Sequence, residues 1–249
     1  MCIRDSRYGH PASYLGWLGD DAHGRLILDA LCAEQVDTSR CRVVQGPNAH
    51  NVVSLVDGER IFGAYDHGVC AQIALTEEDL DFIGQHDLVH TSTYSHLERD
   101  IERLSAVSPF LSFDFADRSD PEYFSSFLPW INFALVSYPG YSVSETEDLM
   151  RWMLAQGPEV VLITRGAEGA MAGDGRQIHR QGIVETEVVD TLGAGDAFAA
   201  RFLVEYLCGA SIPNALEAAS TSAAETCSYY GAFGYGAPFR LDSTDKVKD

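Results

Sequence analysis

The sequence predicts an α/β fold in which a mostly parallel central sheet has helices on both faces, with a small additional β-sheet. Short β-rich runs alternate with helical stretches, and the run 159–164 is apolar in the way of strands buried on both faces. The strand-like runs 51–57 and 60–65 flank Gly58 and indicate a hairpin. The hairpin interrupts the alternation, so we assign it to the small appended sheet.

The remaining elements follow from local signals along the chain. Thr76 followed by Glu77, Glu78 and Asp79 is an N-cap with an acidic first turn, and Ser144 is expected to cap the helix that runs to residue 156. We expect strands at 14–18, 88–91, 110–115, 131–137 and 159–164, and helices at 22–34, 96–107 and 144–156.

Composition excludes several classes of protein. Apolar residues make up 46% of the 249 residues and charged residues 22%, which is ordinary for a soluble globular chain and excludes wholesale disorder. The sequence has no apolar run of about 20 residues, the length that a membrane-spanning helix needs. The net charge of -20 disfavours nucleic acid and anionic membranes as partners. Any anionic substrate must therefore be held by a local site.

The six cysteines are scattered and have no spacing typical of zinc ligands. We expect them to be buried, reduced thiols of a cytoplasmic protein. The pair His86 and His90 lacks the glutamate of a metalloprotease pattern and is not interpreted as a metal site.

The most informative segment is 188–198. A β-branched run ends at Asp190, glycines follow, and a helix with one apolar face begins. Gly193 and Gly195 permit a tight turn that leaves backbone N–H groups free at a helix N-terminus, which is an anion site. Asp196 would repel a resting phosphate, but it fits a phosphate in transfer if it accepts the proton of the attacking hydroxyl. The alternative is a glycine-rich turn with an acidic helix start.

The nine residues from Asp190 to Phe198 (DTLGAGDAF) are similar to the C-terminal signature of the ribokinase-like (PfkB) carbohydrate kinases. The resemblance implies that Gly193, Ala194 and Gly195 form an anion hole and that Asp196 is the catalytic base. It also implies a supporting role for Asp190 and Thr191 in the loop. Asp190 then either orients the loop, which we favour, or helps to bind a monovalent cation.

Two further segments extend the resemblance toward a nucleotide site. Thr164, Arg165, Gly166 and Gly169 match a T-x-G-x-x-G segment that contacts nucleotide phosphates in this family, although loop arginines are also common on surfaces. Gly231 and Ala232 are placed where relatives line the adenine pocket, and the aromatic residues around them are also consistent with core packing. Residues 16–24 resemble an early G-x-D-x-x-G turn, and the hairpin at 48–68 is placed as a lid over the sugar.

The runs 57–65, 75–79, 87–90 and 113–117 resemble the fructoselysine 6-kinase branch of this family. That branch implies phosphorylation of a fructosamine at its 6-hydroxyl, with ATP and Mg²⁺, in a cytoplasmic enzyme that can pair as a homodimer through its lid. The alternatives are a kinase for another sugar, a keto-deoxy acid or a nucleoside, and a non-catalytic chain that binds nucleotide or sugar.

Two departures from the family pattern stand out. The family's first strand and its Gly-Gly-Asn sugar-binding segment are not found, so we expect an N-terminally truncated kinase domain over 7–240. Residues 1–6 show no strand or helix pattern and are interpreted as a non-native leader, and 241–249 as a charged tail. The N-x-x-E pattern that helps to organise magnesium is absent at 137–142, so the sequence assigns no metal ligand.

Overall fold

The structure is a computed structural model that describes residues 2–56 and 59–236. The chain divides into two compact units. The first joins the N-terminal segment up to His10 to Ala74–Gly234, and the second contains Pro11–Ile73. The limits of the kinase domain and of its leader stay a prediction, and the tail 241–249 lies outside the described residues.

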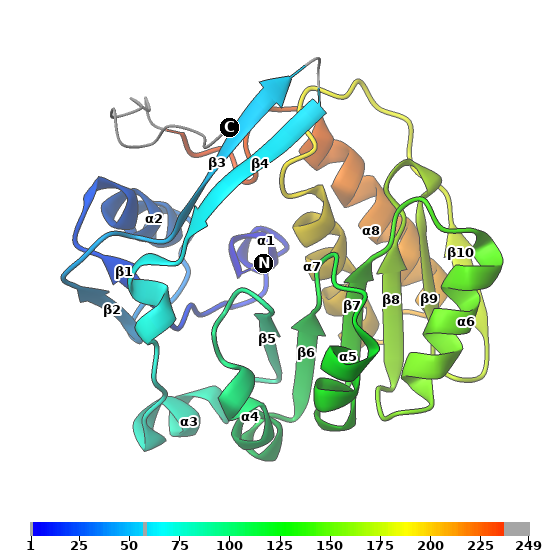
Figure 1. Ribbon diagram of the computed structural model, residues 1–249, viewed down its shortest axis with the longest axis horizontal. Coiled ribbons are helices and arrows are strands. Elements are labelled where there is room, and N and C mark those ends of the chain that lie inside the picture. Colours follow the sequence, from blue (N-terminus) through cyan, green and yellow to red (C-terminus); the bar gives the residue numbers. More distant parts are fainter. Residues whose placement is uncertain (1, 57–58, 237–249) are drawn as a thin grey trace. The chain divides into compact units, whose positions relative to one another are not determined.

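A six-stranded sheet forms the centre of the first unit, in the order β10-β9-β8-β7-β6-β5 (Figure 1). Strands β5 to β8 are parallel, whereas β9 and β10 are antiparallel to their neighbours. The mostly parallel central sheet is therefore confirmed. The strands are β5 (Leu88–Ser92), β6 (Phe110–Asp114), β7 (Phe133–Ser137), β8 (Val160–Thr164), β9 (Ala170–Gly173) and β10 (Ile178–Gln181).

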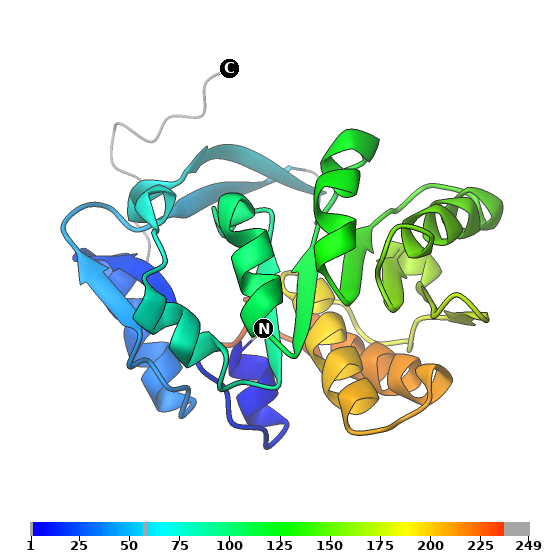
Figure 2. The same ribbon diagram turned by 90° about the horizontal axis from the view of Figure 1, so that it is seen from below.

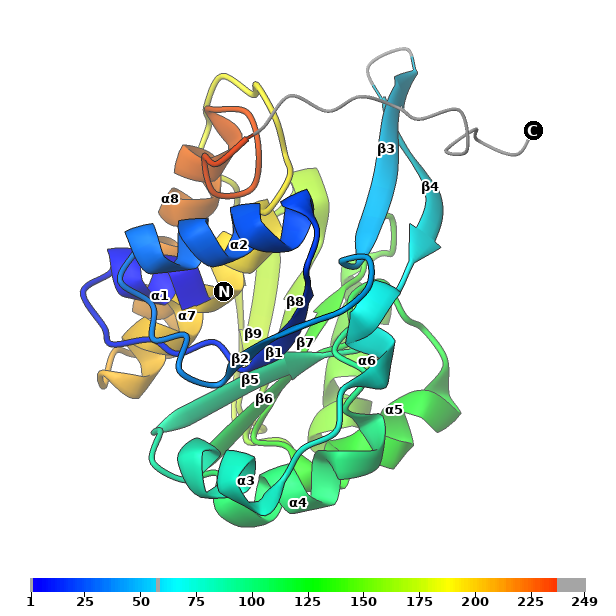
Figure 3. The same ribbon diagram turned by 90° about the vertical axis from the view of Figure 1, so that its left-hand side faces the viewer.

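Helices cover both faces of this sheet, as expected. Figures 2 and 3 show α7 and α8 on one face and α3 to α6 on the other. The helices are α1 (Cys2–Arg7), α3 (Glu77–Ile83), α4 (Ile101–Val107), α5 (Pro121–Phe127), α6 (Val143–Leu154), α7 (Ala194–Leu207) and α8 (Ile212–Cys227). Short 3-10 helices lie at Glu98–Asp100, Leu128–Trp130 and Gly166–Glu168.

Aromatic residues pack against the central strands from both faces of the sheet. On the α7 side, Phe198 and Phe202 are buried in one cluster with Phe133 of β7. On the other side, Phe113 stacks on Phe127 of α5 with ring centroids 4.8 Å apart. A fully buried phenylalanine contributes about 1.5–3 kcal/mol. The central strands are therefore packed against both helical layers.

The second unit is a small α/β arrangement with a hairpin. Strand β1 (Gly16–Gly19) pairs in parallel with β2 (Cys41–Val44), and α2 (Ala22–Ala33) follows β1. The expected hairpin is confirmed as the antiparallel pair β3 (His50–Val56) and β4 (Glu59–Asp66), which a 3-10 helix at Gly68–Gln72 follows. Its turn at residues 57 and 58 lies outside the described residues.

The turn between β1 and α2 contains the glycines and the aspartate of residues 16–24, and its geometry explains their spacing. Asp21 caps α2 by accepting from the amide of Gly24 at 2.8 Å, and it also accepts from the amide of Asn48 at 2.9 Å. A Cβ on Gly24 would lie 2.0 Å from the carbonyl oxygen of Gly19, so no side chain fits there. The segment is a tight turn that needs its glycine.

Two helix starts differ from the sequence-based expectation. His96 has a left-handed φ of 55°, so the helix expected from residue 96 begins only at the 3-10 helix Glu98–Asp100 and continues as α4. The helix α6 is capped by Ser142 rather than Ser144, because Ser142 and Glu145 form a capping box.

Two further expectations are wrong. The N-terminal segment forms α1, because Arg4 and Arg7 find acceptors in the loop after α8. The β-branched run before Asp190 lies outside the sheets of the described residues, and its amides at Val189 and Asp190 donate to the carbonyl of Cys227. Of the five cysteines whose side chains the structure describes, none is fully buried: Cys32 and Cys208 are exposed, and Cys41, Cys70 and Cys227 are half-buried, with no disulfide among the five.

Within the described residues, no helix combines the length and the apolar character that crossing a membrane requires.

Candidate functional site

The turn that precedes α7 has the geometry that the sequence predicts. Gly193 adopts a left-handed conformation with φ 77° and ψ 5°, at the N-cap position of α7. A Cβ on Gly193 would lie 2.8 Å from the Cβ of Ala232 and 2.9 Å from its Cα. Both the conformation and the close approach require glycine at this position.

Backbone donors point out of this turn without acceptors. Among the described residues, the amides of Gly193, Gly195 and Asp196 have no partner, whereas Ala194 donates to the carbonyl of Thr191 at 3.2 Å. A Cβ added to Gly195 would meet nothing within 4 Å, so the space over the turn is open. Free amides at the positive end of a helix, here one of 14 residues, are the arrangement with which proteins bind anions.

Asp190 holds the turn against the C-terminal loop. One carboxylate oxygen accepts from the amide of Leu192 at 2.9 Å, and the other accepts from the amide of Gly231 at 3.0 Å. These contacts fit the orienting role of Asp190. They also join the loop 190–193 to the loop that contains Gly231 and Ala232.

The loop after α8 is fixed by the first helix. The Arg4 guanidinium donates to the Tyr229 hydroxyl at 2.6 Å and to the Ala232 carbonyl at 2.5 Å, and Arg7 donates to the Phe233 carbonyl at 2.8 Å. Tyr230 is 78% exposed, so it is not a core residue. The structure thus brings Gly231 and Ala232 directly beside Gly193.

The segment Thr164–Gly169 is a second tight turn, at the carboxyl end of β8. The Arg165 amide donates to the Gly169 carbonyl at 2.8 Å, and a Cβ on Gly169 would lie 2.0 Å from the Gln181 carbonyl oxygen. The Arg165 side chain is only 8% exposed: it donates to the Tyr141 carbonyl at 2.6 Å and pairs with Glu168. Its Nε is buried without a hydrogen-bond partner among the described residues.

Asp196 is exposed in the first turn of α7, and a second carboxyl group lies close to it. Burial and the charge of Asp196 raise the pKa of Asp114, the last residue of β6, to about 6. Asp114 also accepts from the Ala116 amide at 2.8 Å. Sequence reasoning missed Asp114 as a site residue, although its place at the end of a parallel strand was a usable signal.

A group of polar residues after β5 and β6 was also missed. Arg118 donates through Nε to the Thr93 hydroxyl at 3.1 Å, and its guanidinium lies 4.8 Å from the centroid of the Tyr123 ring. Tyr94, on the β5 side, is 53% exposed. These residues follow strand ends whose register is set by the pairing of Ser92 with Asp114.

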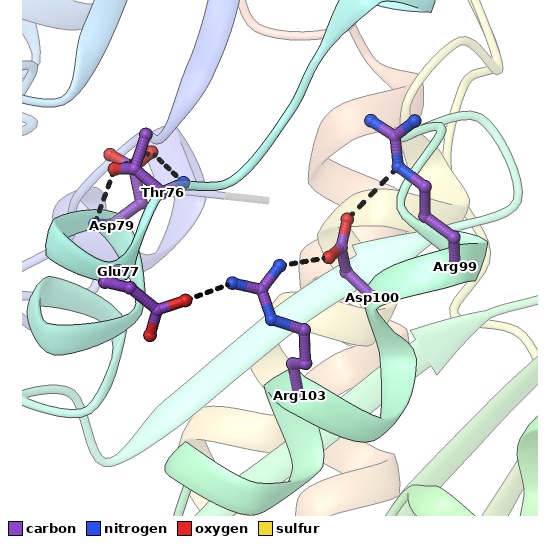
Figure 4. Close-up of polar contacts among 6 residues, drawn as sticks. All are labelled: Thr76, Glu77, Asp79, Arg99, Asp100 and Arg103. Atoms are coloured by element: carbon purple, nitrogen blue, oxygen red, sulfur yellow. Dashed lines mark hydrogen bonds and ion pairs between the residues drawn. The ribbon is translucent and has the colours of Figure 1, made fainter.

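An ion-pair network supports the far end of the loop after β5 (Figure 4). The Asp100 carboxylate is buried and accepts from Arg103 at 2.6 Å and from Arg99 at 3.4 Å. Arg103 also pairs with Glu77 of α3 at 2.8 Å. The network joins the start of α3 to the start of α4 and is a structural support.

The described residues contain no group of three or more His, Cys, Asp and Glu side chains able to hold a metal ion. Magnesium usually keeps several waters and binds through one or two carboxylates together with phosphate oxygens. The carboxylates near the turn before α7, those of Asp196 and Asp114, are too few to hold magnesium by themselves. They fit a magnesium ion that is bound mainly by the phosphate oxygens of a nucleotide.

Comparison with known proteins decides the family. Residues 5–110 and 133–237 match the pfkB family carbohydrate kinase domain. The chain belongs to this family of carbohydrate kinases. Fructosamine kinase FrlD of Bacillus subtilis (strain 168) is 39% identical over 255 residues, which cover 100% of this chain and 89% of that protein. Fructoselysine 6-kinase of Escherichia coli (strain K12) is 36% identical and covers 94% of this chain and 89% of that protein.

Solved structures show that this kinase has the ribokinase-like fold. Arabidopsis thaliana ribokinase, solved with ribose and ATP, superposes with a TM-score of 0.81 at 22% identity, over 93% of this chain and 80% of that chain. An E. coli protein described as a candidate ribokinase II, solved with ATP and Mg²⁺, gives 0.78 at 18% identity, over 94% of this chain and 82% of that chain.

Proposed function

We propose that this carbohydrate kinase transfers the γ-phosphoryl group of ATP to the 6-hydroxyl of a fructosamine such as fructoselysine. The observation that carries the proposal is the open turn at 193–196, where free amides and a carboxylate lie in one helix start. The names of the two relatives above support the substrate class. The site is a catalytic one because Asp196 adds a base to the anion site.

The reaction is a direct displacement at phosphorus. Asp196 accepts the proton of the 6-hydroxyl, whose oxygen forms a bond to the γ-phosphorus, and the bond from that phosphorus to the bridging oxygen breaks to release ADP. Gly193, Ala194 and Gly195 form the anion hole, in which the free amides of Gly193 and Gly195 donate to oxygens of the transferring group. Magnesium bound to ATP neutralises phosphate charge.

We assign the rest of the nucleotide to two loops. Thr164, Arg165, Gly166 and Gly169 lie against its phosphates, and the buried, unpartnered Nε of Arg165 supports this placement. Gly231 and Ala232 line the adenine side, which their contacts with the 190–193 turn support. We also propose that the enzyme works in the cytoplasm and pairs through its lid hairpin.

The test compares substrates and a base variant in one assay of ADP release. With ATP and Mg²⁺, the chain should phosphorylate fructoselysine with a higher kcat/KM than fructose or ribose. Asp196→Asn should lower kcat by about 10²- to 10⁴-fold, because a positioned base contributes that much. Asp148→Asn, an exposed carboxylate on α6, is the matched control and should leave kcat unchanged.

Each part of the proposal fails separately. Full activity of Asp196→Asn would remove the base. Turnover of fructose or ribose without turnover of any fructosamine would remove the substrate class but leave the kinase. Binding of ATP in calorimetry without transfer to any sugar would favour a non-catalytic chain.

A further inference from the structure

The Arg118 side chain is oriented by contacts with Thr93 and Tyr123, while its two terminal nitrogens remain available to a ligand. Its Nε donates to Thr93, whose hydroxyl also bonds the Tyr123 hydroxyl at 2.9 Å, and its guanidinium lies over the Tyr123 ring. Nη1 and Nη2 have no hydrogen-bond or ion-pair partner among the described residues. A guanidinium oriented by packing and by one hydrogen bond loses little entropy when it binds a planar anion.

The backbone around Arg118 is strained on both neighbouring loops. Only three described non-glycine residues have a positive φ, and two of them are Ala116 at 53° and His96 at 55°. The two loops are tied together, because the Thr93 amide donates to the Asp114 carbonyl at 3.0 Å. Such strain persists where the surroundings over-determine the backbone, and it clusters at ligand sites.

The charges around Arg118 restrict what can bind there. Burial and the charges of Asp117 and Asp114 raise the pKa of the Tyr94 phenol, whereas the charge of Arg118 lowers it, so these four residues lie together. Asp196 in turn acts on Asp114. Two carboxyl groups, those of Asp117 and Asp114, thus lie in the surroundings of Arg118, and Asp196 lies on the side of Asp114.

The combination of one arginine with nearby carboxyl groups favours the binding of a carboxylate over that of a phosphate. A phosphate at Arg118 would face Asp117 and Asp114 with its full negative charge. The carboxylate of an amino acid arrives with the ammonium group of the same residue, so the pair carries no net charge. The Arg118 fork also matches a carboxylate with two parallel hydrogen bonds.

We propose that Arg118 binds the carboxylate of the amino-acid part of the substrate. Arg118 is then the residue that selects sugar–amino acid adducts over adducts of simple amines. The proposal rests on the proposed function, because it takes the sugar hydroxyl to be at Asp196 and extends the same substrate toward β5 and β6.

The experiment removes one partner of the contact at a time: the carboxylate of the substrate or the guanidinium of Arg118. Fructoselysine is compared with 1,5-diaminopentane that carries the same 1-deoxyfructosyl group on one nitrogen, which is the same molecule without its carboxylate. Wild type should prefer fructoselysine by about 10- to 100-fold in kcat/KM, as expected for hydrogen bonds between charged groups. Arg118→Met should lose this preference by lowering kcat/KM for fructoselysine alone, mainly through KM.

Two further variants separate binding from folding. Arg118→Lys keeps the stem and the charge but not the fork, so its loss should be smaller than that of Arg118→Met. Arg176→Met removes an exposed arginine of the β9–β10 turn and should leave the preference unchanged. The comparison of the two substrates with wild type needs no variant, so it tests the proposal even if Arg118→Met folds poorly.

An equal loss for both substrates with Arg118→Met would overturn the proposal and would place Arg118 on the transferred group. Equal kcat/KM of wild type for both adducts would overturn it as well. In both cases the fructosamine kinase activity itself stands. If wild type phosphorylates neither adduct, the proposed function fails, and this inference fails with it.

Discussion

Gly193 and Ala232 lie so close that a Cβ on the glycine would be 2.8 Å from the Cβ of the alanine. The two residues are 39 positions apart, and they belong to the anion turn and to the loop after α8. Since Gly193 also has a φ of 77°, the shape of the anion turn depends on this contact. The positions of the free amides are therefore set by packing as well as by the local sequence.

Gly193→Ala is expected to destabilise the chain by about 1–3 kcal/mol, because it adds backbone strain and a clash with Ala232. It should also lower kcat by displacing the amide donors. Gly195→Ala is the matched comparison: its Cβ meets nothing within 4 Å and lies in a helix, so stability should hold or rise by about 1 kcal/mol. Its methyl group would instead occupy the open space over the turn and raise KM for ATP.

Thermal unfolding and ATP-dependent ADP release measure these two effects separately. A Gly193→Ala variant that is as stable as wild type would contradict the argument from close packing. A Gly195→Ala variant with unchanged KM for ATP would mean that the phosphates bind elsewhere.

Asp190→Ala should destabilise the chain by about 1–3 kcal/mol, because two backbone amides lose a charged acceptor. Asp190→Asn keeps one acceptor oxygen and should lose less. Urea unfolding gives the stability, and KM for ATP reports on the joined loops.

A comparison of wild type with Asp190→Ala separates the two roles that Asp190 could have. If Asp190 only orients the loop, replacing potassium with sodium should change activity equally in wild type and in Asp190→Ala. A potassium dependence that disappears in the variant, with stability unchanged, would instead show a cation site.

The sequence predicts the anion turn because its determinants are local. Nine consecutive residues contain the glycines, the acidic helix start and Phe198, the first residue of the apolar face of α7. The helix start at Glu98 could not be predicted in this way, because His96 is left-handed in a loop that its tertiary contacts shape. The surroundings of Arg118 could not be predicted for the same reason, since they depend on the pairing of β5 with β6.

The helix α1 shows most clearly what local sequence patterns cannot predict. Arg4 meets Tyr229 and Ala232, which lie more than 220 positions away in the sequence. No periodicity within six residues could predict a helix whose partners are at the other end of the chain. The antiparallel pair β9 and β10 and the helix α8 were likewise not predicted.

Asp100→Asn should destabilise the chain by about 1–3 kcal/mol, because a buried carboxylate loses its charge between Arg103 and Arg99. Arg103 keeps Glu77 as a partner, which limits the loss. Glu77→Gln is the control: this side chain is 87% exposed, so its pair should contribute at most about 1 kcal/mol. Equal losses in the two variants, measured by urea unfolding, would show that burial at Asp100 does not strengthen the pair.

Asp114→Asn should stabilise the chain, and by an amount that depends on pH. Burial and then the charge of Asp196 raise the pKa of Asp114 from 3.8 to about 6 in the folded chain. Between these values the folded state binds more protons than the unfolded state, so this group lowers stability as pH rises from about 4 to about 6. Asparagine can still accept from the Ala116 amide, but it carries no charge. The variant therefore does not lose stability at this position as pH rises.

The gain from Asp114→Asn should be near zero at pH 4, grow through pH 6 and stay constant above it, at up to about 3 kcal/mol. His90 titrates in the opposite sense, because burial lowers its pKa to about 3 and its contribution is lost as pH falls below about 6.5. His90 is present in both proteins, so the difference between variant and wild type cancels its effect. Urea unfolding at pH 4, 5, 6, 7 and 8 measures that difference. A gain that does not change with pH would mean that neither burial nor the charge of Asp196 raises the pKa of Asp114 in the folded chain.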